Sequence, residues 1–305
     1  MHLDLYVTIA GLVVGFVVGM TGMGGGALMT PVLVLVFGIQ PLAAVSSDLV
    51  ASMIMKPVGG AVHVRRGTVH KELVRWLVLG SVPSAFCGVL LIKALGNGAG
   101  VQSIVKVSLG VALLVAVTMM IARAVLDVRQ RYRQAGRVPI EPSTVNVRPL
   151  PTLAVGVLGG LVVGLTSVGS GSLIIVALLM LYPTLKAGDL VGTDLVQAVP
   201  LVASAALGHL IFGDFQFGLT ASILIGSLPG VYLGARLSSS APSWLIRRAI
   251  AIVLLASALK LLDVPTVTVG WTLLAVLVVS PFVWTRIRRT IKGQARRTIA
   301  AAAGT

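Results

Sequence analysis

Two carboxylates lie inside apolar sequence, where a negative charge is costly. Asp48 follows two serines, Asp194 follows Thr193, and long apolar runs flank both. Insertion of a carboxylate at membrane depth costs about 2.5–3.5 kcal/mol on insertion scales. Its presence at two matching places therefore indicates a functional role. Two interpretations stay open. Each Asp is part of a proton relay or ion-coupling site, or it caps the start of a helix, as Ser, Thr and Asp often do.

Three other ionisable side chains accompany these carboxylates. Lys56 follows Asp48 by two helical turns. It would pair with Asp48 or attract an anion, or its ammonium group would instead extend to a membrane surface. His63 and His209 occupy matching places, and no neighbouring carboxylate motif supports a metal there. Positive charges at helix C-termini are the favoured interpretation for both. Neither a metal nor a cofactor is therefore expected.

A glycine-rich segment precedes each carboxylate. Glycine costs about 1 kcal/mol per helix position relative to alanine, so both segments are predicted to interrupt a helix. Free backbone N–H groups at the start of a half-helix attract anions, whereas small residues alone would indicate close helix packing. Because the run is duplicated, we favour a substrate site. The predicted substrate-binding residues are Thr21, Gly24, Gly25, Gly26, Thr166, Ser167, Gly169, Ser170 and Gly171.

The whole chain follows a duplicated plan. After the glycine segments, Gly80-Ser81-Val82-Pro83 matches Gly226-Ser227-Leu228-Pro229. In each copy a broken segment, 5–38 or 151–182, precedes three helices, near 43–63, 72–93 and 102–126, then near 189–212, 217–236 and 244–262. A further helix near 267–285 has no counterpart. Each broken segment is too long for one crossing, so a helical hairpin is predicted. Two such repeats indicate a transporter with its site between the halves.

Composition defines the class of protein. Apolar residues make up 56% of the chain and charged residues 11%, against about 25% charged in soluble domains. We therefore expect an all-α polytopic integral membrane protein with about eight or nine main transmembrane segments. The expected domains are a first membrane repeat at 1–126, a basic linker at 127–150, a second repeat at 151–262, and an extra helix with a basic tail at 263–305.

The net charge of +15 is explained by topology. Arg and Lys gather beside apolar runs, as topology-setting charges do, so no nucleic-acid partner is expected. With the linker 127–150 in the cytoplasm, the basic loop 64–71 lies there as well. The hairpin model also puts the basic tail in the cytoplasm, and the base-free loop 213–216 outside. The two repeats are then inverted relative to each other. Two parallel repeats would put the basic tail outside.

The glycine motif also carries a resemblance to a known family. Gly19-x-x-Gly22-x-Gly24-Gly25-Gly26-x-x-x-x-Pro31, followed by Ala43…Ser47 and His63…Gly67, resembles the sulfite exporter TauE/SafE family. The likeness covers roughly residues 5–262 and includes the second copy, Gly164 to Gly234. It implies a permease of the bacterial inner membrane that handles sulfur-containing or other organic anions. The second copy departs from the fuller pattern at Ser167, Ser170 and Val176.

These observations predict a secondary transporter for a small anion, such as sulfite or a sulfonate. A passive anion channel, or an intramembrane enzyme, is the alternative. The sequence has no nucleophile, metal or nucleotide motif of an enzyme, and no enzymatic activity is expected. The single cysteine, Cys87, lies in apolar sequence and is expected to be a packed, unreactive thiol. The expected partners are the anion and the lipid bilayer.

Overall fold

A computed structural model describes residues 4–21, 25–65, 67–96, 98–134, 146–183, 185, 187–237 and 243–303. Over these residues the chain forms α-helices and no strand. The helices of the first half are α1 (Leu5–Thr21), α2 (Gly26–Leu35), α3 (Pro41–Arg65), α4 (Lys71–Ala94) and α5 (Ala99–Gln134). Those of the second half are α6 (Pro149–Thr166), α7 (Leu173–Leu181), α8 (Ala187–Phe212), α9 (Phe217–Leu237), α10 (Ser243–Leu261) and α11 (Thr266–Ala303).

Six described helices are long and apolar enough to cross a membrane. They are α4, α5, α6, α8, α9 and α11, while α1 and α2 are shorter apolar helices. The expectation of an all-α membrane protein is confirmed at this level. The number of eight or nine main segments, the domain boundaries and the inverted arrangement stay predictions.

Both segments predicted to break do so, and each second part is short. With 10 and 9 residues, α2 and α7 are about 15 Å long, half of a hydrocarbon core of about 30 Å. At the end of α7, the Tyr182 hydroxyl lies 2.6 Å from Thr152 Oγ1 near the start of α6. Leu33 of α2 belongs to the same buried cluster as Val7 of α1. Each short helix therefore returns toward the start of the helix before it.

Glycines allow two helix pairs to pack backbone against backbone. A Cβ at Gly226 of α9 would overlap the Thr8 carbonyl of α1, and one at Gly164 of α6 would overlap the Ala85 carbonyl of α4. The successive contacts run in the same direction in both pairs, so α1 is parallel to α9 and α4 is parallel to α6. Small residues at such contacts are typical of membrane helices. Each pair joins a helix of one half to a helix of the other.

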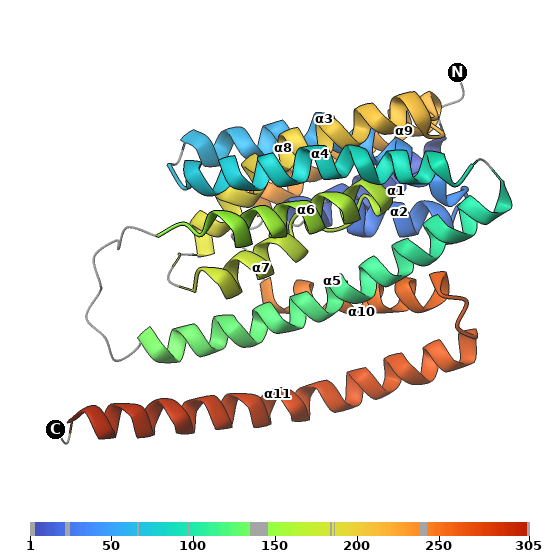
Figure 1. Ribbon diagram of the computed structural model, residues 1–305. Coiled ribbons are helices and arrows are strands. Elements are labelled where there is room, and N and C mark those ends of the chain that lie inside the picture. Colours follow the sequence, from blue (N-terminus) through green and yellow to red (C-terminus); the bar gives the residue numbers. More distant parts are fainter. Residues whose placement is uncertain are drawn as a thin grey trace.

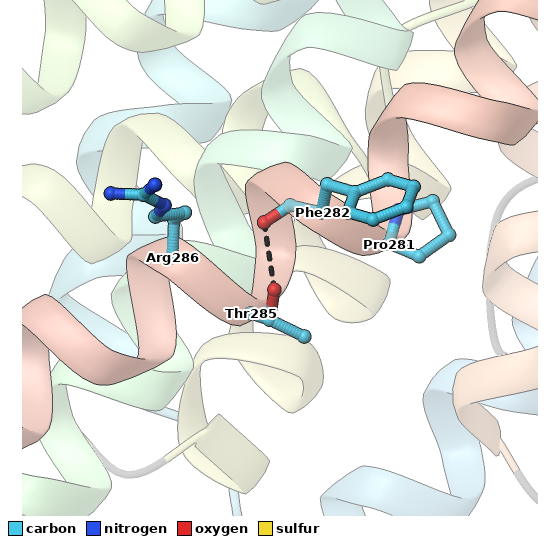
Figure 2. Close-up of a pocket in the computed structure, with 4 residues that line it drawn as sticks. All are labelled: Pro281, Phe282, Thr285 and Arg286. Atoms are coloured by element: carbon cyan, nitrogen blue, oxygen red, sulfur yellow. Dashed lines mark hydrogen bonds between the residues drawn. The ribbon is translucent and has the colours of Figure 1, made fainter.

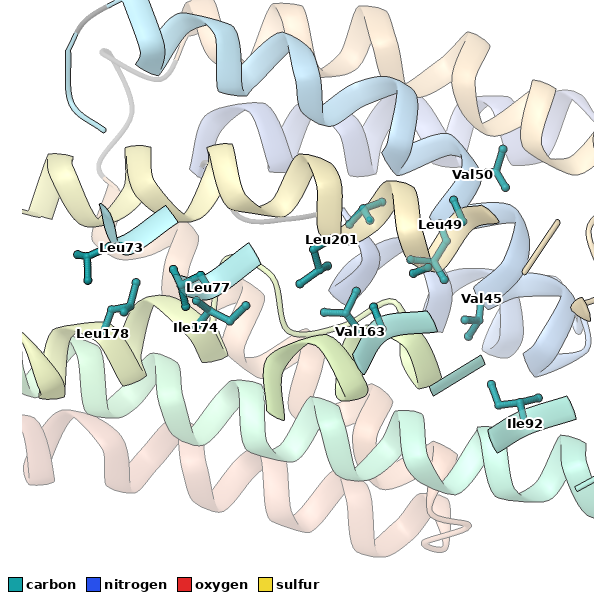
Figure 3. Packing of buried hydrophobic residues seen from close by; sticks show 14 of the residues in the cluster. Val45, Leu49, Val50, Leu73, Leu77, Ile92, Val163, Ile174, Leu178 and Leu201 are labelled. Carbon is teal, nitrogen blue, oxygen red and sulfur yellow. The ribbon is translucent and has the colours of Figure 1, made fainter. Parts of the chain in front are cut away.

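The helices α3 and α8 pack against each other and run antiparallel. Near the start of α3, Ser46 Oγ lies 2.8 Å from Nδ1 of His209 in the last turn of α8. Near the start of α8, Thr193 Oγ1 accepts the backbone N–H of His70, just beyond α3, at 3.0 Å. Buried aliphatic side chains from α3, α4, α6, α7 and α8 pack beside this pair (Figure 3).

The outermost helix is α11, which packs beside α5 and α10 and is largely exposed along its apolar stretch (Figure 1). It ends later than the apolar run suggests, because its basic sequence up to Ala303 continues the helix. In the same way α5 extends to Gln134, into the predicted linker. Arg and Gln are good helix formers, so charge ends the apolar run without ending the helix.

One prediction about a side chain is wrong. Cys87 lies on the exposed side of α4 instead of in a packed interior. Its neighbours Ala85 and Gly88 are the residues that face inward, where they meet α6. In a helix the faces of adjacent residues differ by about 100°, so an apolar neighbourhood in sequence did not identify the buried face.

Candidate functional site

The two helix breaks meet at the centre of the molecule. Gly26, the first residue of α2, lies directly against Ser167, which follows the last residue of α6. A Cβ at Gly26 would overlap both the carbonyl oxygen and the hydroxyl of Ser167. The glycine segment of the first half is therefore in contact with the matching segment of the second half. Both residues were predicted to belong to one site, and the structure brings them together.

The second break is held open by left-handed backbone. Ser167, Gly169 and Gly171 have φ values of 61°, 129° and 99°. Glycine adopts such conformations without steric cost, which explains two of the three positions. The Thr166 hydroxyl lies 2.6 Å from the Val162 carbonyl and accepts the Val168 N–H at 3.2 Å. Thr166 therefore stabilises the break itself.

Asp48 connects three elements at this point. It lies inside α3, is 2% exposed, and its Oδ2 accepts hydrogen bonds from Thr30 of α2 at 3.0 Å and from Ser167 at 2.6 Å. Because α3 begins at Pro41, Asp48 is two turns inside the helix. The N-cap interpretation of Asp48 is therefore wrong.

Asp194 occupies the corresponding place in α8 with different neighbours. It is 1% exposed, and Oδ1 accepts from the Gln197 amide at 3.0 Å. The other end of that amide accepts from the Ser81 hydroxyl of α4 at 3.3 Å. Asp194 also interacts electrostatically with Arg123 of α5, and it accepts a hydrogen bond from the backbone of Gly171. It lies well inside α8, which begins at Ala187, so it does not cap that helix either.

Lys56 links the two carboxylates. Its ammonium group donates to the hydroxyl of Ser170 in the second break, and Ser170 is buried. Electrostatic interactions join it to Asp48 on its own helix and to Asp194 on α8. The Lys56 side chain therefore extends toward the buried polar groups and not to a membrane surface. We call these groups the polar centre; they are Thr30, Asp48, Lys56, Ser81, Ser167, Ser170, Asp194 and Gln197. The cation of the first half therefore interacts with the carboxylate of the second half more strongly than with that of its own helix.

The first break differs from the second in its surroundings. Gly25 has φ −60°, and a Cβ built there would have open space around it. The Thr21 hydroxyl donates to the Val17 carbonyl of its own helix at 2.8 Å. Gly24 lies outside the described residues. The structure therefore places Gly25 beside free volume, whereas Gly26 is fully packed.

A second polar cluster closes one end of the α3–α8 pair. His209 is completely buried, and its Nε2 donates to the Gly164 carbonyl at 2.8 Å, since a carbonyl oxygen only accepts. Ser46 Oγ, which faces Nδ1, also accepts the Asp214 N–H at 3.3 Å. All these bonds are made with one proton on the ring, so no positive charge is needed at this helix end. The side chain of His63 lies outside the described part of the structure.

Charge-rich clusters typical of metal sites do not occur among the described residues. In the described part of the chain, every buried side-chain nitrogen or oxygen atom has a hydrogen-bond partner. A surface depression lined by Pro281, Phe282, Thr285 and Arg286 lies on a single turn of α11 (Figure 2). It includes no residue of the polar centre, and the Thr285 hydroxyl donates to Phe282 within the helix at 2.8 Å.

Several residues of the polar centre were not predicted from sequence. Gln197 is three residues after Asp194, a spacing that places two side chains on one helix face, so its position held a usable signal. Thr30 and Ser81 reach the polar centre from other helices, and no local pattern marks them. Arg123 lies at the polar end of an apolar run, where its position is typical of a topology-setting charge.

The long apolar helices and the buried polar centre between two matching halves define a multi-pass membrane protein of the transporter class. The chain belongs to the sulfite exporter TauE/SafE family, whose model matches residues 7–261.

Relatives that cover most of the chain are named as membrane transporters. The chain is 38% identical over 261 residues to the probable membrane transporter protein YjnA of Bacillus subtilis (strain 168), covering 85% of this chain and all of the relative. Identity is 21% over 236 residues with the probable membrane transporter protein YdhB of the same organism, covering 77% and 91%. It is 25% over 263 residues with a probable membrane transporter protein of Xylella fastidiosa (strain Temecula1 / ATCC 700964), covering 84% and 94%. No solved structure shows a significant match.

Proposed function

We propose that this protein is a secondary transporter that moves a small anion across the membrane by alternating access. The observation that carries the proposal is the junction of the two helix breaks at Gly26 and Ser167. Irregular backbone at membrane depth is tolerated where protein buries it or a polar path passes it. Discontinuous helices that meet between two halves are the usual substrate site of secondary transporters.

The two halves are inverted repeats in this proposal. Three relationships support it: α3 is antiparallel to its counterpart α8, α1 is parallel to α9, and α4 is parallel to α6. An axis in the membrane plane that exchanges α1 with α6 and α4 with α9 converts one parallel pair into the other. The same axis reverses α3 onto α8. Such a relation lets the same movement open either side.

Two hydrogen bonds would close the transport path, one on each side of the membrane. We call them the closing points. At one end, Ser47 Oγ accepts the backbone N–H of Gln216, in the loop after α8, at 3.3 Å. At the other end, Thr193 Oγ1 holds the backbone of His70, in the loop after α3. Each hydroxyl belongs to the residue immediately before a central carboxylate, Asp48 or Asp194. A change at either carboxylate would therefore act directly on the neighbouring closing point.

The anion would bind beside the second break and the start of α2. Lys56 supplies a positive charge at Ser170, Gly25 adjoins open space, and α2 begins without a side-chain cap. A helix N-terminus favours an anion by about 0.3–1 kcal/mol when exposed and up to about 2 kcal/mol when partly buried. Hydroxyl and N–H donors suit an oxyanion, so sulfite or a sulfonate headgroup is the proposed substrate class. The proposed location is the bacterial inner membrane, with the linker and the C-terminal tail in the cytoplasm.

Uptake into proteoliposomes tests this function. Labelled sulfite, methanesulfonate and acetate would be offered to wild type, to Lys56→Gln and to Gly25→Val, whose Cβ enters open space. Saturable uptake of sulfite or methanesulfonate that both variants lose, with folding intact, is the expected result. Uptake that does not saturate would indicate a channel. Unchanged uptake in both variants would remove Lys56 and the first break from the site.

A further inference from the structure

The two central carboxylates differ in how their negative charge is stabilised. Asp194 interacts with two cations, Lys56 and Arg123, and accepts the Gln197 amide. Asp48 accepts the neutral hydroxyls of Ser167 and Thr30 and interacts more weakly with one cation, Lys56. Asp194 therefore has two charged partners, whereas the groups bonded directly to Asp48 are neutral hydroxyls.

The other charged groups near Asp48 do not change this comparison. Among the described side chains of the helices packed on α3, α2 has no ionisable group, and the exposed Arg236 of α9 lies over the Tyr232 ring. On α8 the titratable groups are Asp189, Asp194 and His209, of which His209 is engaged by Ser46 and Gly164. On α5, Lys106 pairs with Asp263 at 2.5 Å, and Arg123 acts on Asp194.

An anion bound at Lys56 would compete with Asp48 for the same positive charge. Lys56 already contacts Ser170 in the proposed substrate site, so a bound anion and an ionised Asp48 would both rely on it. A buried carboxylate without a cation is strongly disfavoured in a low-dielectric interior. A proton on Asp48 removes that conflict. By linkage, a proton that favours anion binding is itself favoured by the bound anion to the same extent.

We propose that Asp48 is the coupling site, and that it takes up a proton together with the transported anion while Asp194 remains ionised as the counter-ion of Lys56. The inference rests on the proposed transport function. The proton comes from water on one side, forms an O–H bond at the carboxyl of Asp48, and returns to water on the other side. No other bond forms or breaks. Proton and anion then cross together.

The position of Asp48 explains how its charge would affect conformation. Two hydroxyl donors converge on the same oxygen, Oδ2. If that oxygen becomes an O–H donor, one hydroxyl must turn to accept or lose its bond. One of these donors is Ser167, whose left-handed backbone forms the second break and packs against Gly26. Protonation therefore acts at the contact between the two breaks, where a movement of the halves would begin.

A proton fits this position better than a metal ion. Ca²⁺ and Mg²⁺ need about six or more oxygen ligands, whereas the groups bonded to Asp48 are two hydroxyls, which donate to it. A proton requires a single oxygen. A cation such as Na⁺ in this role is an alternative that the experiment distinguishes.

Transport of methanesulfonate by proteoliposomes tests the coupling, because this anion of a strong acid carries no proton of its own. In wild type, a pH gradient should accumulate it by up to about tenfold per unit of pH difference for one proton per anion. Asp48→Asn should retain exchange of internal for external methanesulfonate and lose accumulation on the gradient. Asp194→Asn, which leaves Lys56 without its counter-ion, should lose both. Accumulation by Asp48→Asn at the wild-type level, or accumulation that follows a Na⁺ gradient, would overturn the proposal.

Infrared spectroscopy separates failure of the coupling from failure of the transport function. If wild type carries no methanesulfonate, the proposed function fails for this anion, while the protonation of Asp48 is still measurable in the purified protein. The other carboxyl groups of the chain also gain C=O bands on acidification. The Asp48 band is therefore identified as one component that shifts in heavy water, is present in wild type and in Asp194→Asn, and is absent from Asp48→Asn. The same band in Asp48→Asn would contradict the assignment whatever the transport result. Thermal unfolding confirms that each variant is folded.

Discussion

Gly26 and Ser167 lie in direct contact although 141 positions separate them along the chain. The contact joins the start of α2 to the end of α6, and Ser167 continues it to the carboxylate of Asp48 at 2.6 Å. One junction therefore connects both helix breaks with the buried charge of α3. Changes on either side of it should affect folding and transport together.

Gly26→Ala is expected to destabilise the protein, because its Cβ overlaps the backbone carbonyl of Ser167, which cannot turn aside as a side chain would. Overpacking of this kind costs about 1–3 kcal/mol. The matched control is Gly25→Ala, one residue earlier, where the Cβ enters open space at a φ of −60°. Thermal unfolding in detergent should show a lower midpoint for Gly26→Ala alone. Equal midpoints for the two variants would mean that the breaks are not in close contact.

The glycine contacts between α1 and α9 give a second prediction. Gly226→Ala introduces a Cβ that overlaps the Thr8 carbonyl, so the two backbones must separate. Gly270→Ala in α11 is the control, since nothing lies near its Cβ and alanine favours the helix by about 1 kcal/mol. Gly226→Ala should reduce the yield of folded, monodisperse protein in size-exclusion chromatography, while Gly270→Ala should equal or exceed wild type. A normal yield of Gly226→Ala would show that α1 and α9 pack less closely.

His209 should act as a neutral hydrogen-bonding group. His209→Phe keeps the ring volume but leaves the Gly164 carbonyl and Ser46 without their partner. An unsatisfied buried polar group costs about 1–3 kcal/mol, so a clear loss of thermal stability is expected. In Ser46→Ala, the bond to Nδ1 is lost and the Gly164 bond remains, so a smaller loss should follow. If Ser46→Ala is the more harmful of the two, the Gly164 bond contributes little.

The elements of this protein were easier to predict from sequence than their contacts. Composition and glycine spacing predicted the helices, both breaks and the pairs of matching residues, because these depend on local chemistry and length. The duplicated pattern also marked Asp48 and Asp194 as residues with a use inside the membrane. Their helical positions were harder to predict, since Ser-Ser-Asp is typical of a helix start as well as of a polar turn inside a helix.

The partners of those residues depend on tertiary structure. Thr30 and Ser167 reach Asp48 from two other elements, and neither spacing nor composition relates them to it. The same is true of Lys56, whose bond to Ser170 joins the two halves. Even the face of a helix was ambiguous at Cys87, where neighbours on all sides are apolar in sequence. Polar contacts between helices are therefore what the structure adds.

The orientation of the two halves is the last prediction. In the inverted arrangement the loop after α3 and the loop after α8 lie on opposite sides of the membrane, as their different content of basic residues indicates. Single cysteines at Lys71 and Gln216, both exposed, would be introduced into a Cys87→Ala background, which removes the exposed native thiol. A membrane-impermeant maleimide applied to intact cells should label the Gln216→Cys variant, and the Lys71→Cys variant only after the membrane is opened. Gln216 is expected outside because the linker 127–150 is taken to be cytoplasmic. If only the Lys71→Cys variant is labelled on intact cells, the repeats are still inverted, but the linker lies outside. Labelling of both variants from one side would show that the repeats are parallel, and the alternating-access geometry proposed from α3 and α8 would then be wrong.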